Sequence, residues 1–190
     1  MASMTVMPRE EYEWTVDDLD RLPDDGLQYE LLDGILLVSP APMLRHQRAA
    51  ARLHLLLAPA CPDDLEVYFA PVDWRPDLRT SLQPDLLVVR REDLEERNLT
   101  RPLVLAVEVL SPSSRRKDAV LKRSKYQDSG IGHYWIVDPA GPSILALELV
   151  DGTYRTVGEA TGGATTDRCS GAGVCGQLRN PQPNSAILCA

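Results

Sequence analysis

Two segments of the chain, residues 84–89 and 103–110, are too continuously apolar to be ordinary surface strands. Strands that are buried on both faces have this composition, whereas strands with one solvated face alternate apolar and polar residues. Each segment also contains one acid. Asp85 opens the first segment directly after Pro84, and Glu108 lies inside the second. The pattern therefore predicts a sheet that is covered on both sides and carries a carboxylate on each of two inner strands.

Helical spacing and turn residues predict the other elements. Thr15, with Asp18 three residues later, has the form of a capping box that starts a short helix. Asp33-Gly34 is a strong signal for a hairpin turn. The order of elements predicts an α/β fold, a mixed central β-sheet flanked by helices. The expected helices cover residues 16–22, 46–57 and 117–129, the last closed by Gly130, and the other strands lie within residues 29–38, 65–74, 133–138, 144–150 and 153–157.

The length of 190 residues, 44% of them hydrophobic, suits one buried core. Residues 1–12 lack periodicity and are expected to be a flexible N-terminus, followed by one domain over residues 13–158. Residues 158–176 hold half of the twelve glycines, so residues 159–190 are expected to be a disordered or atypical tail. No apolar stretch approaches the ~20 residues of a membrane span, and no leader opens the chain. We therefore expect a cytoplasmic protein without membrane contact.

The formal charge of −8 does not exclude a nucleic-acid partner, because it is unevenly distributed. Residues 1–34 hold ten acids and two bases, so the rest of the chain carries 18 of each. Within that rest, residues 115–125 hold six bases and one acid. Such a concentration predicts a phosphate-binding surface, with a solvated helix face as the alternative. The residues expected to bind nucleic acid are Arg115, Arg116, Lys117, Arg123 and Lys125.

A carboxylate within an apolar strand is costly to desolvate unless a cation or several donors compensate it. An edge position or a buried arginine would explain Glu108 structurally, and a strand start would explain Asp85. Together on neighbouring strands, the two acids would form a site for Mg²⁺ or Mn²⁺, which bind one or two carboxylates plus water and phosphate oxygens. A nearby lysine would orient the attacking water and offset the charge on phosphorus. The acids thus predict metal-assisted phosphodiester hydrolysis.

Pro84-Asp85 followed by Glu108 resembles the PD-(D/E)XK nuclease superfamily, although Leu110 stands where that pattern has its lysine. Over about residues 12–157, the chain resembles one branch of it, the Uma-type restriction-endonuclease-like family, long known as a domain of unknown function. The matching motifs are Tyr29-Glu30-Leu-Leu-Asp33-Gly34, Ser39-Pro40 followed by His46, Gln83-Pro84-Asp85, Glu108-Val-Leu-Ser111-Pro112-Ser113, Asp118-x3-Lys122-x3-Tyr126, and Gly130-Ile-x-His-Tyr-Trp135-Ile-Val-Asp138-Pro139.

The resemblance implies a restriction-endonuclease-like core and a lysine supplied by the helix that follows the second acid. Lys122 stands at the matching position. Asp118, Lys122 and Tyr126 are four residues apart and therefore share one helix face. Glu30 and His46 match family positions near the metal site. These two residues, with Asp118 and Tyr126, are expected to support catalytic Asp85, Glu108 and Lys122. The alternatives are a helix cap or a packed side chain for His46 and core packing for Tyr126.

The sequence thus predicts a Mg²⁺-dependent endodeoxyribonuclease, with DNA as the substrate that the resemblance implies. Related nucleases dimerise to cut both strands, so a homodimer is one expected state. The alternative is a non-catalytic module that binds nucleic acid or a protein on the same scaffold. Acyl transfer by Ser111 or Ser113 is not supported, because no Gly-x-Ser-x-Gly turn is present.

Overall fold

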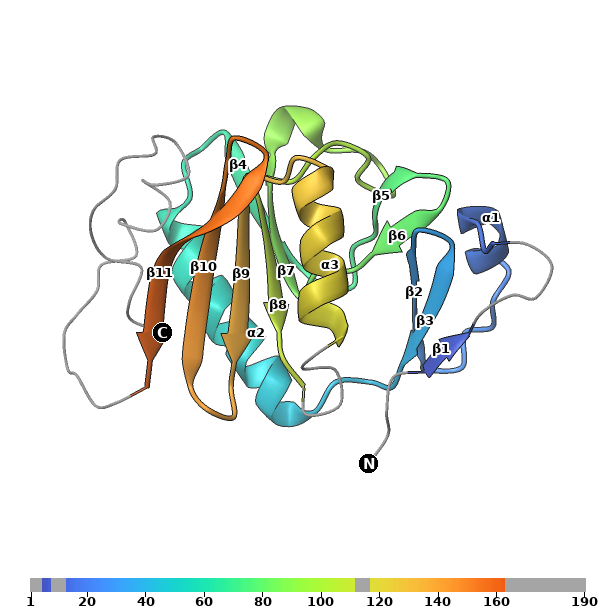
Figure 1. Ribbon diagram of the computed structural model, residues 1–190, viewed down its shortest axis with the longest axis horizontal. Coiled ribbons are helices and arrows are strands. Elements are labelled where there is room, and N and C mark those ends of the chain that lie inside the picture. The colour runs from blue at the N-terminus through green and yellow to red at the C-terminus, as the bar shows by residue number, and fades with distance from the viewer. Residues whose placement is uncertain (1–4, 8–12, 112–116, 163–190) are drawn as a thin grey trace.

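The computed structural model describes residues 5–7, 13–111 and 117–162 (Figure 1). Its larger sheet has six strands, and among these only the neighbours β8 and β9 are parallel. This confirms the predicted α/β fold with a mixed central sheet. The strand order is β11 (Thr153–Thr161), β10 (Ser143–Val150), β9 (His133–Asp138), β8 (Leu105–Val109), β7 (Leu86–Arg90) and β4 (Leu65–Phe69).

A smaller antiparallel sheet lies beside the larger one, on the right in Figure 1. Its order is β1 (Thr5–Met7), β3 (Ile35–Ser39), β2 (Gln28–Leu32), β6 (Thr80–Leu82) and β5 (Trp74–Asp77). The hairpin predicted at Asp33-Gly34 joins β2 to β3, and both turn residues have positive φ, 49° and 84°. A Cβ on Gly34 would also lie 2.7 Å from the Cβ of Glu13, so the turn requires glycine there.

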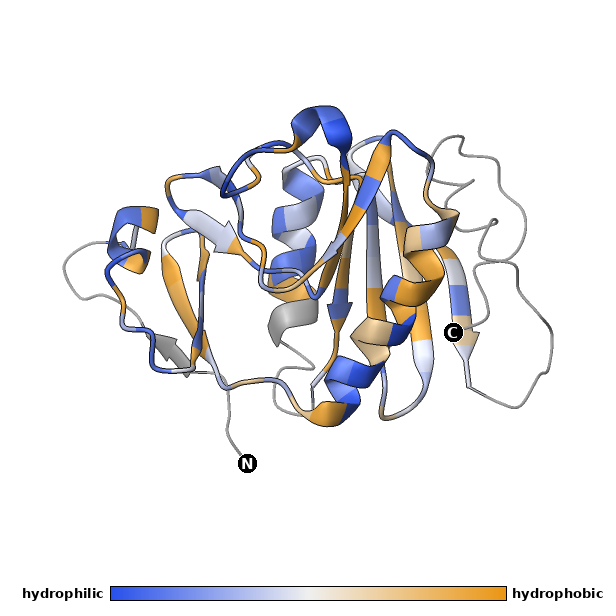
Figure 2. Ribbon diagram, turned by 180° about the vertical axis from the view of Figure 1, so that it is seen from behind, coloured by the Kyte–Doolittle hydropathy of each residue, from blue (hydrophilic) through white to orange (hydrophobic). Residues whose placement is uncertain are grey.

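Two long helices cover opposite faces of the six-stranded sheet. Helix α3 (Lys117–Asp128) lies on one face in Figure 1, and α2 (Leu44–Leu57) lies on the other, which Figure 2 shows from behind. The short helix α1 (Val16–Leu19) starts at the predicted capping box of Thr15 and Asp18. Single 3₁₀ turns follow α2 at Ala58–Ala60 and β7 at Arg91–Asp93. None of the helices in the described ranges is long and apolar enough to cross a membrane.

Successive residues of a strand point to opposite faces, and β7 shows how this divides the core. Leu86 and Val88 pack in the cluster on the α2 side, whereas Leu87 and Val89 pack in the cluster that contains Tyr126 of α3. Both faces are therefore buried, as the continuous apolar segments predict. The α3 side also includes four residues of the smaller sheet, so the two sheets share one core: Leu32, Leu37, Trp74 and Leu82.

At the chain ends, the expected end of the last strand was wrong. Strand β11 continues past the expected end at residue 157, because a bulge at Ala146/Leu147 lets Gly158 pair with Ala146 through backbone groups alone. Residues 5–7, expected to be flexible, pair with β3 as a strand too short to show periodicity. The rest of residues 1–12, apart from 5–7, and residues 163–190 of the expected tail lie outside the described parts.

The strand expected over residues 65–74 is two strands in different sheets. β4 ends at Phe69, and Trp74 starts β5. Pro71 explains the break, because proline lacks an N–H donor and restricts the residue before it. Other boundaries differ by a few residues: α1 ends before residue 22, and α2 starts two residues before His46.

Candidate active site

The candidate site lies where β7 begins and β8 ends. These strands are antiparallel, with Leu86 opposite Val107, so continuing the register by one residue places Asp85 beside Glu108. Val107 and Val109 pack in the cluster on the α2 side. Glu108 lies between them in sequence and therefore points to the α3 side. The sheet thus brings the two predicted acids together and turns Glu108 toward the helix that carries the predicted lysine.

Lys122 and Tyr126, one turn apart on α3, both contact Glu108. The Nζ of Lys122 lies 3.2 Å from Glu108 Oε1 and 2.9 Å from Glu30 Oε1. The hydroxyl of Tyr126 donates to Glu108 Oε1 at 2.7 Å. Lys122 is 3% exposed and Glu108 7%, so this ion pair is shielded from water. The structure therefore brings together four residues that the sequence analysis places in the site, Glu108, Lys122, Tyr126 and Glu30, with Glu30 as the second acid on the same ammonium group.

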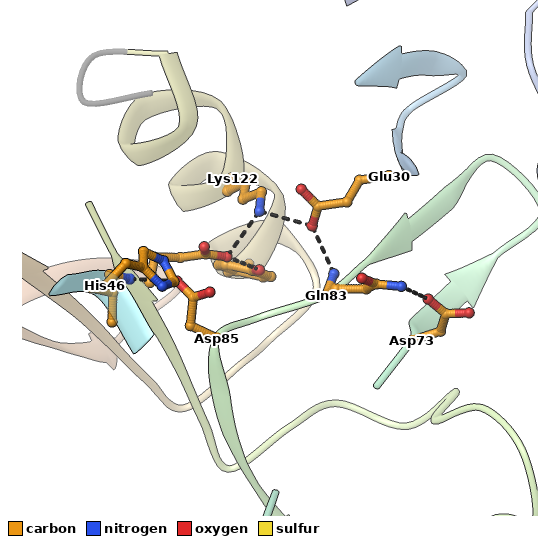
Figure 3. Close-up of polar contacts among 9 residues, drawn as sticks. Glu30, His46, Asp73, Gln83, Asp85 and Lys122 are labelled. Carbon is orange, nitrogen blue, oxygen red and sulfur yellow. Dashed lines mark hydrogen bonds and ion pairs between the residues drawn. The ribbon is translucent and has the colours of Figure 1, made fainter. Parts of the chain in front are cut away.

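Glu30 is held by a residue that the sequence analysis did not select. The backbone N–H of Gln83 donates to Glu30 Oε1 at 2.7 Å, and its side-chain amide donates to Asp73 Oδ1 at 2.8 Å (Figure 3). Asp73 is in turn paired with Arg75 at 2.8 Å. The sequence could have indicated Gln83, because it directly precedes Pro84-Asp85 in one of the matching motifs. Asp73 and Arg75 belong to no recognised motif.

Asp85 is fixed from the side of α2 and from β8. His46 Nε2 lies 3.1 Å from Asp85 Oδ2, and the backbone N–H of Val109 donates to the same oxygen at 2.7 Å (Figure 3). Helix α2 begins after Met43, which makes no side-chain cap. His46 therefore contacts the acid and does not cap the helix, which was the alternative interpretation.

Negative charge exceeds positive charge around Glu108. The pKa of its carboxyl is raised to about 8, chiefly by burial; Lys122 opposes the shift, and neighbouring Asp85 and Glu30 add to it. Burial also raises the pKa of Tyr126 well above its usual value, so this hydroxyl stays a hydrogen-bond donor. An additional cation near Asp85 and Glu108 would stabilise the ionised carboxylates.

A family model described as "Putative restriction endonuclease", Uma2, matches residues 16–173. The chain belongs to the Uma2 family. A crystal structure of a protein from Anabaena variabilis ATCC 29413, described as a "putative nuclease belonging to DUF820", has a similar fold with a TM-score of 0.63 at 14% identity. That similarity covers 75% of this chain and 83% of the other. No curated protein sequence shows significant similarity to the chain. Family and fold thus agree on a restriction-endonuclease-like protein.

The Uma2 acids suit a hard divalent cation. In the described part of the chain, the hydrogen bonds to Asp85 use Oδ2 and those to Glu108 use Oε1, so Oδ1 and Oε2 accept no hydrogen bond from the described residues. The described residues form no group of three or more His, Cys, Asp or Glu that could hold a metal. Mg²⁺ takes one or two carboxylates and completes its shell with water and phosphate oxygens, so Asp85 and Glu108 are the residues that could hold it.

The predicted phosphate-binding surface is only partly visible. Lys125 Nζ lies 2.6 Å from Asp33 and 2.9 Å from Asp77, and Arg123 donates to the Tyr154 carbonyl at 3.4 Å. These contacts engage both bases within the protein, at the turns of the smaller sheet and at β11. Arg115 and Arg116, and the side chains of Lys117 and Asp118, lie outside the described residues. Phosphate contact by this group stays a prediction.

Proposed function

We propose that this Uma2 protein hydrolyses nucleic-acid phosphodiester bonds, with DNA as substrate and Mg²⁺ or Mn²⁺ as cofactor. The observation that supports it most is the buried contact of Lys122 with Glu108, next to Asp85, in a site that carries more acids than bases. Buried charges of this kind are expensive, and perturbed carboxyl groups gather at functional sites. Family membership supports the same class of reaction.

Four residues have distinct roles in the proposed hydrolysis. Asp85 and Glu108 would hold the metal ion, which supplies phosphoryl polarisation and a lower pKa for water when bound. Lys122 orients the attacking water and stabilises charge on the phosphate. Tyr126 fixes the Glu108 carboxylate by its 2.7 Å hydrogen bond.

Two further residues act through these. Glu30 shares the Lys122 ammonium group with Glu108, and His46 fixes Asp85. Both are positioning residues under the proposal, since each contacts a proposed catalytic side chain.

The test is cleavage of plasmid and oligonucleotide DNA by the purified full chain in Mg²⁺, in Mn²⁺ and in chelator. We expect metal-dependent cleavage by the wild type and loss of it in Asp85→Asn and Glu108→Gln. Glu66→Gln, which neutralises an acid on β4 of the same sheet, is the matched control and should cleave normally. Absence of Mn²⁺ binding by the wild type in calorimetry, with nucleic acid still bound, would favour the non-catalytic alternative.

A further inference from the structure

A cavity of about 760 Å³ adjoins the candidate site. Four residues of the site network, labelled in Figure 3, border it: His46, Asp73, Gln83 and Asp85. Its volume is in the range of small-molecule sites, roughly 300–1,000 Å³. The cavity shares Asp85 with the proposed metal site, so a substrate held at Asp85 has this space directly beside it.

Several solvent-exposed side chains that border the cavity are apolar or aromatic, and we call them its rim. Phe69 is 60% exposed, and its ring packs edge-on against His54 with centroids 5.3 Å apart. Leu55 and Leu27, which also border the cavity, are 72% and 44% exposed. These side chains come from β4, from α2 and from the segment before β2, and their exposed surface faces solvent. Such a rim suits a flat, apolar occupant.

The sheet also ties this rim to the candidate site. Phe69 pairs with Leu86, the residue after Asp85, and the backbone N–H of Ala70 donates to the Asp85 carbonyl at 3.1 Å. On α2, His54 follows His46 by eight residues, so both histidines lie on the helix face toward the cavity. The aromatic pair therefore lies close along the sheet to Asp85, where the proposal places the reacting phosphate.

The charged residues that border the cavity determine which part of a nucleic acid can enter it. Arg75 is the one lysine or arginine among the residues that border the cavity, and it is already paired with Asp20 and Asp73, each at 2.8 Å. A phosphate would be repelled here, whereas an uncharged base would not. The carboxylates that border the cavity are Asp20, Asp24, Asp73 and Asp85.

We propose that this cavity receives one unpaired nucleobase of the strand whose phosphate lies at Asp85 and Glu108. The inference rests on the proposed function and adds a substrate preference to it. The base stacks on Phe69 and His54, as bases stack on exposed aromatic side chains in single-strand-binding proteins. Carboxylates at the wall accept hydrogen bonds from exocyclic amino groups, so cytosine and adenine are preferred to thymine. Single-stranded or locally unpaired DNA is then the better substrate.

The test uses short single-stranded oligonucleotides with one fluorescent 2-aminopurine, moved from position to position, bound in Ca²⁺ to the full chain. One position should be quenched by wild type and not by Phe69→Ala. The same substitution should weaken binding about 5- to 100-fold, the usual effect of losing one stacking platform. Leu78→Ala, which removes a side chain that is 70% exposed and does not border the cavity, should bind like wild type.

An abasic residue provides the matched change in the ligand. Placed at the quenched position, it should weaken binding to the wild type more than binding to Phe69→Ala, which has already lost part of the stacking surface. Wild type that binds and cleaves DNA, with Phe69→Ala unchanged and no position quenched, would overturn the base site and leave the proposed function intact. Wild type that neither binds nor cleaves in any metal would overturn both. Binding of a lysine-rich peptide that Phe69→Ala abolishes, without an effect on DNA, would assign the cavity to a basic protein partner.

Discussion

Glu108 illustrates how a functional residue can oppose folding. Its pKa in the folded protein is about 8, against 4.5 for an unperturbed group, chiefly because of burial. Between these values the native state binds a proton that the unfolded state has lost, so the free energy of unfolding decreases as pH rises through this interval. The loss is at most about 1.4 kcal/mol per pH unit.

Glu108→Gln should therefore make the free energy of unfolding less dependent on pH between 4.5 and about 8. Above this interval the variant should be at least as stable as the wild type. The amide oxygen of Gln can still accept from Tyr126, so the packing is kept. Urea unfolding at several pH values measures the effect, with Glu66→Gln as control. A variant that kept the full wild-type slope would show that Glu108 does not titrate as we expect.

Lys122→Met tests the lysine that α3 supplies. It removes the cation between Glu30 and Glu108, and unpaired buried charges cost about 3–5 kcal/mol. Cleavage should fall about 10²- to 10³-fold, the loss typical when one donor that stabilises transition-state charge is removed. Mn²⁺ binding, measured by calorimetry, should persist or tighten, because a like charge near the metal is removed.

The double variant Glu30→Gln/Lys122→Met should recover part of the stability and none of the activity. Glu30→Gln alone should have intermediate activity. Wild-type cleavage by a folded Lys122→Met protein would show that the catalytic lysine lies elsewhere.

At the scale of elements, the end of α3 depends on one residue. Gly130 has φ of +76°, and the bonds from Gly130 N–H to Gln127 and from Ile131 N–H to Tyr126 form a Schellman motif. A Cβ on Gly130 would contact nothing within 4 Å, so the cost of Gly130→Ala is backbone strain alone, about 1–2 kcal/mol. Thermal unfolding measures it, and Gly141→Ala, in a turn without positive φ, should change stability less. Equal losses in both variants would argue against the motif as the cause.

Local sequence patterns predicted where helices, strands and turns lie better than they predicted which distant residues contact each other. The positive-φ turn at Asp33-Gly34 and the closing Gly130 follow from residue type, and the boundaries of β9 match the expectation. The pair Lys122 and Glu30 is separated by 92 residues, and no periodicity reports such a distance. Lys122 was selected only through the resemblance to a family. Neither local sequence patterns nor the family resemblance indicated Arg75. Its ion pairs with Asp20 and Asp73 form only because the folded chain brings these residues together.

For the whole molecule, a net charge of −8 means that any attraction to nucleic acid must be local. We predict that neutralising Arg115, Arg116 and Lys117 together lowers the slope of log affinity against log salt by about one unit for each phosphate that these side chains neutralise. Binding titrations at several salt concentrations measure this slope for the variant and the wild type. A control that neutralises Arg155, on β11, should keep the wild-type slope. An unchanged slope in the triple variant would place the binding surface elsewhere.

The alternation along β7 and β8 limits how this protein can change over generations. Glu108 faces α3 only because its neighbours Val107 and Val109 face α2. Deleting or inserting a single codon within β8 would exchange their places, leaving an acid against the α2 core and a valine opposite Lys122. Substitutions can therefore tune the site, whereas changes of length are tolerated only in the connections outside these strands.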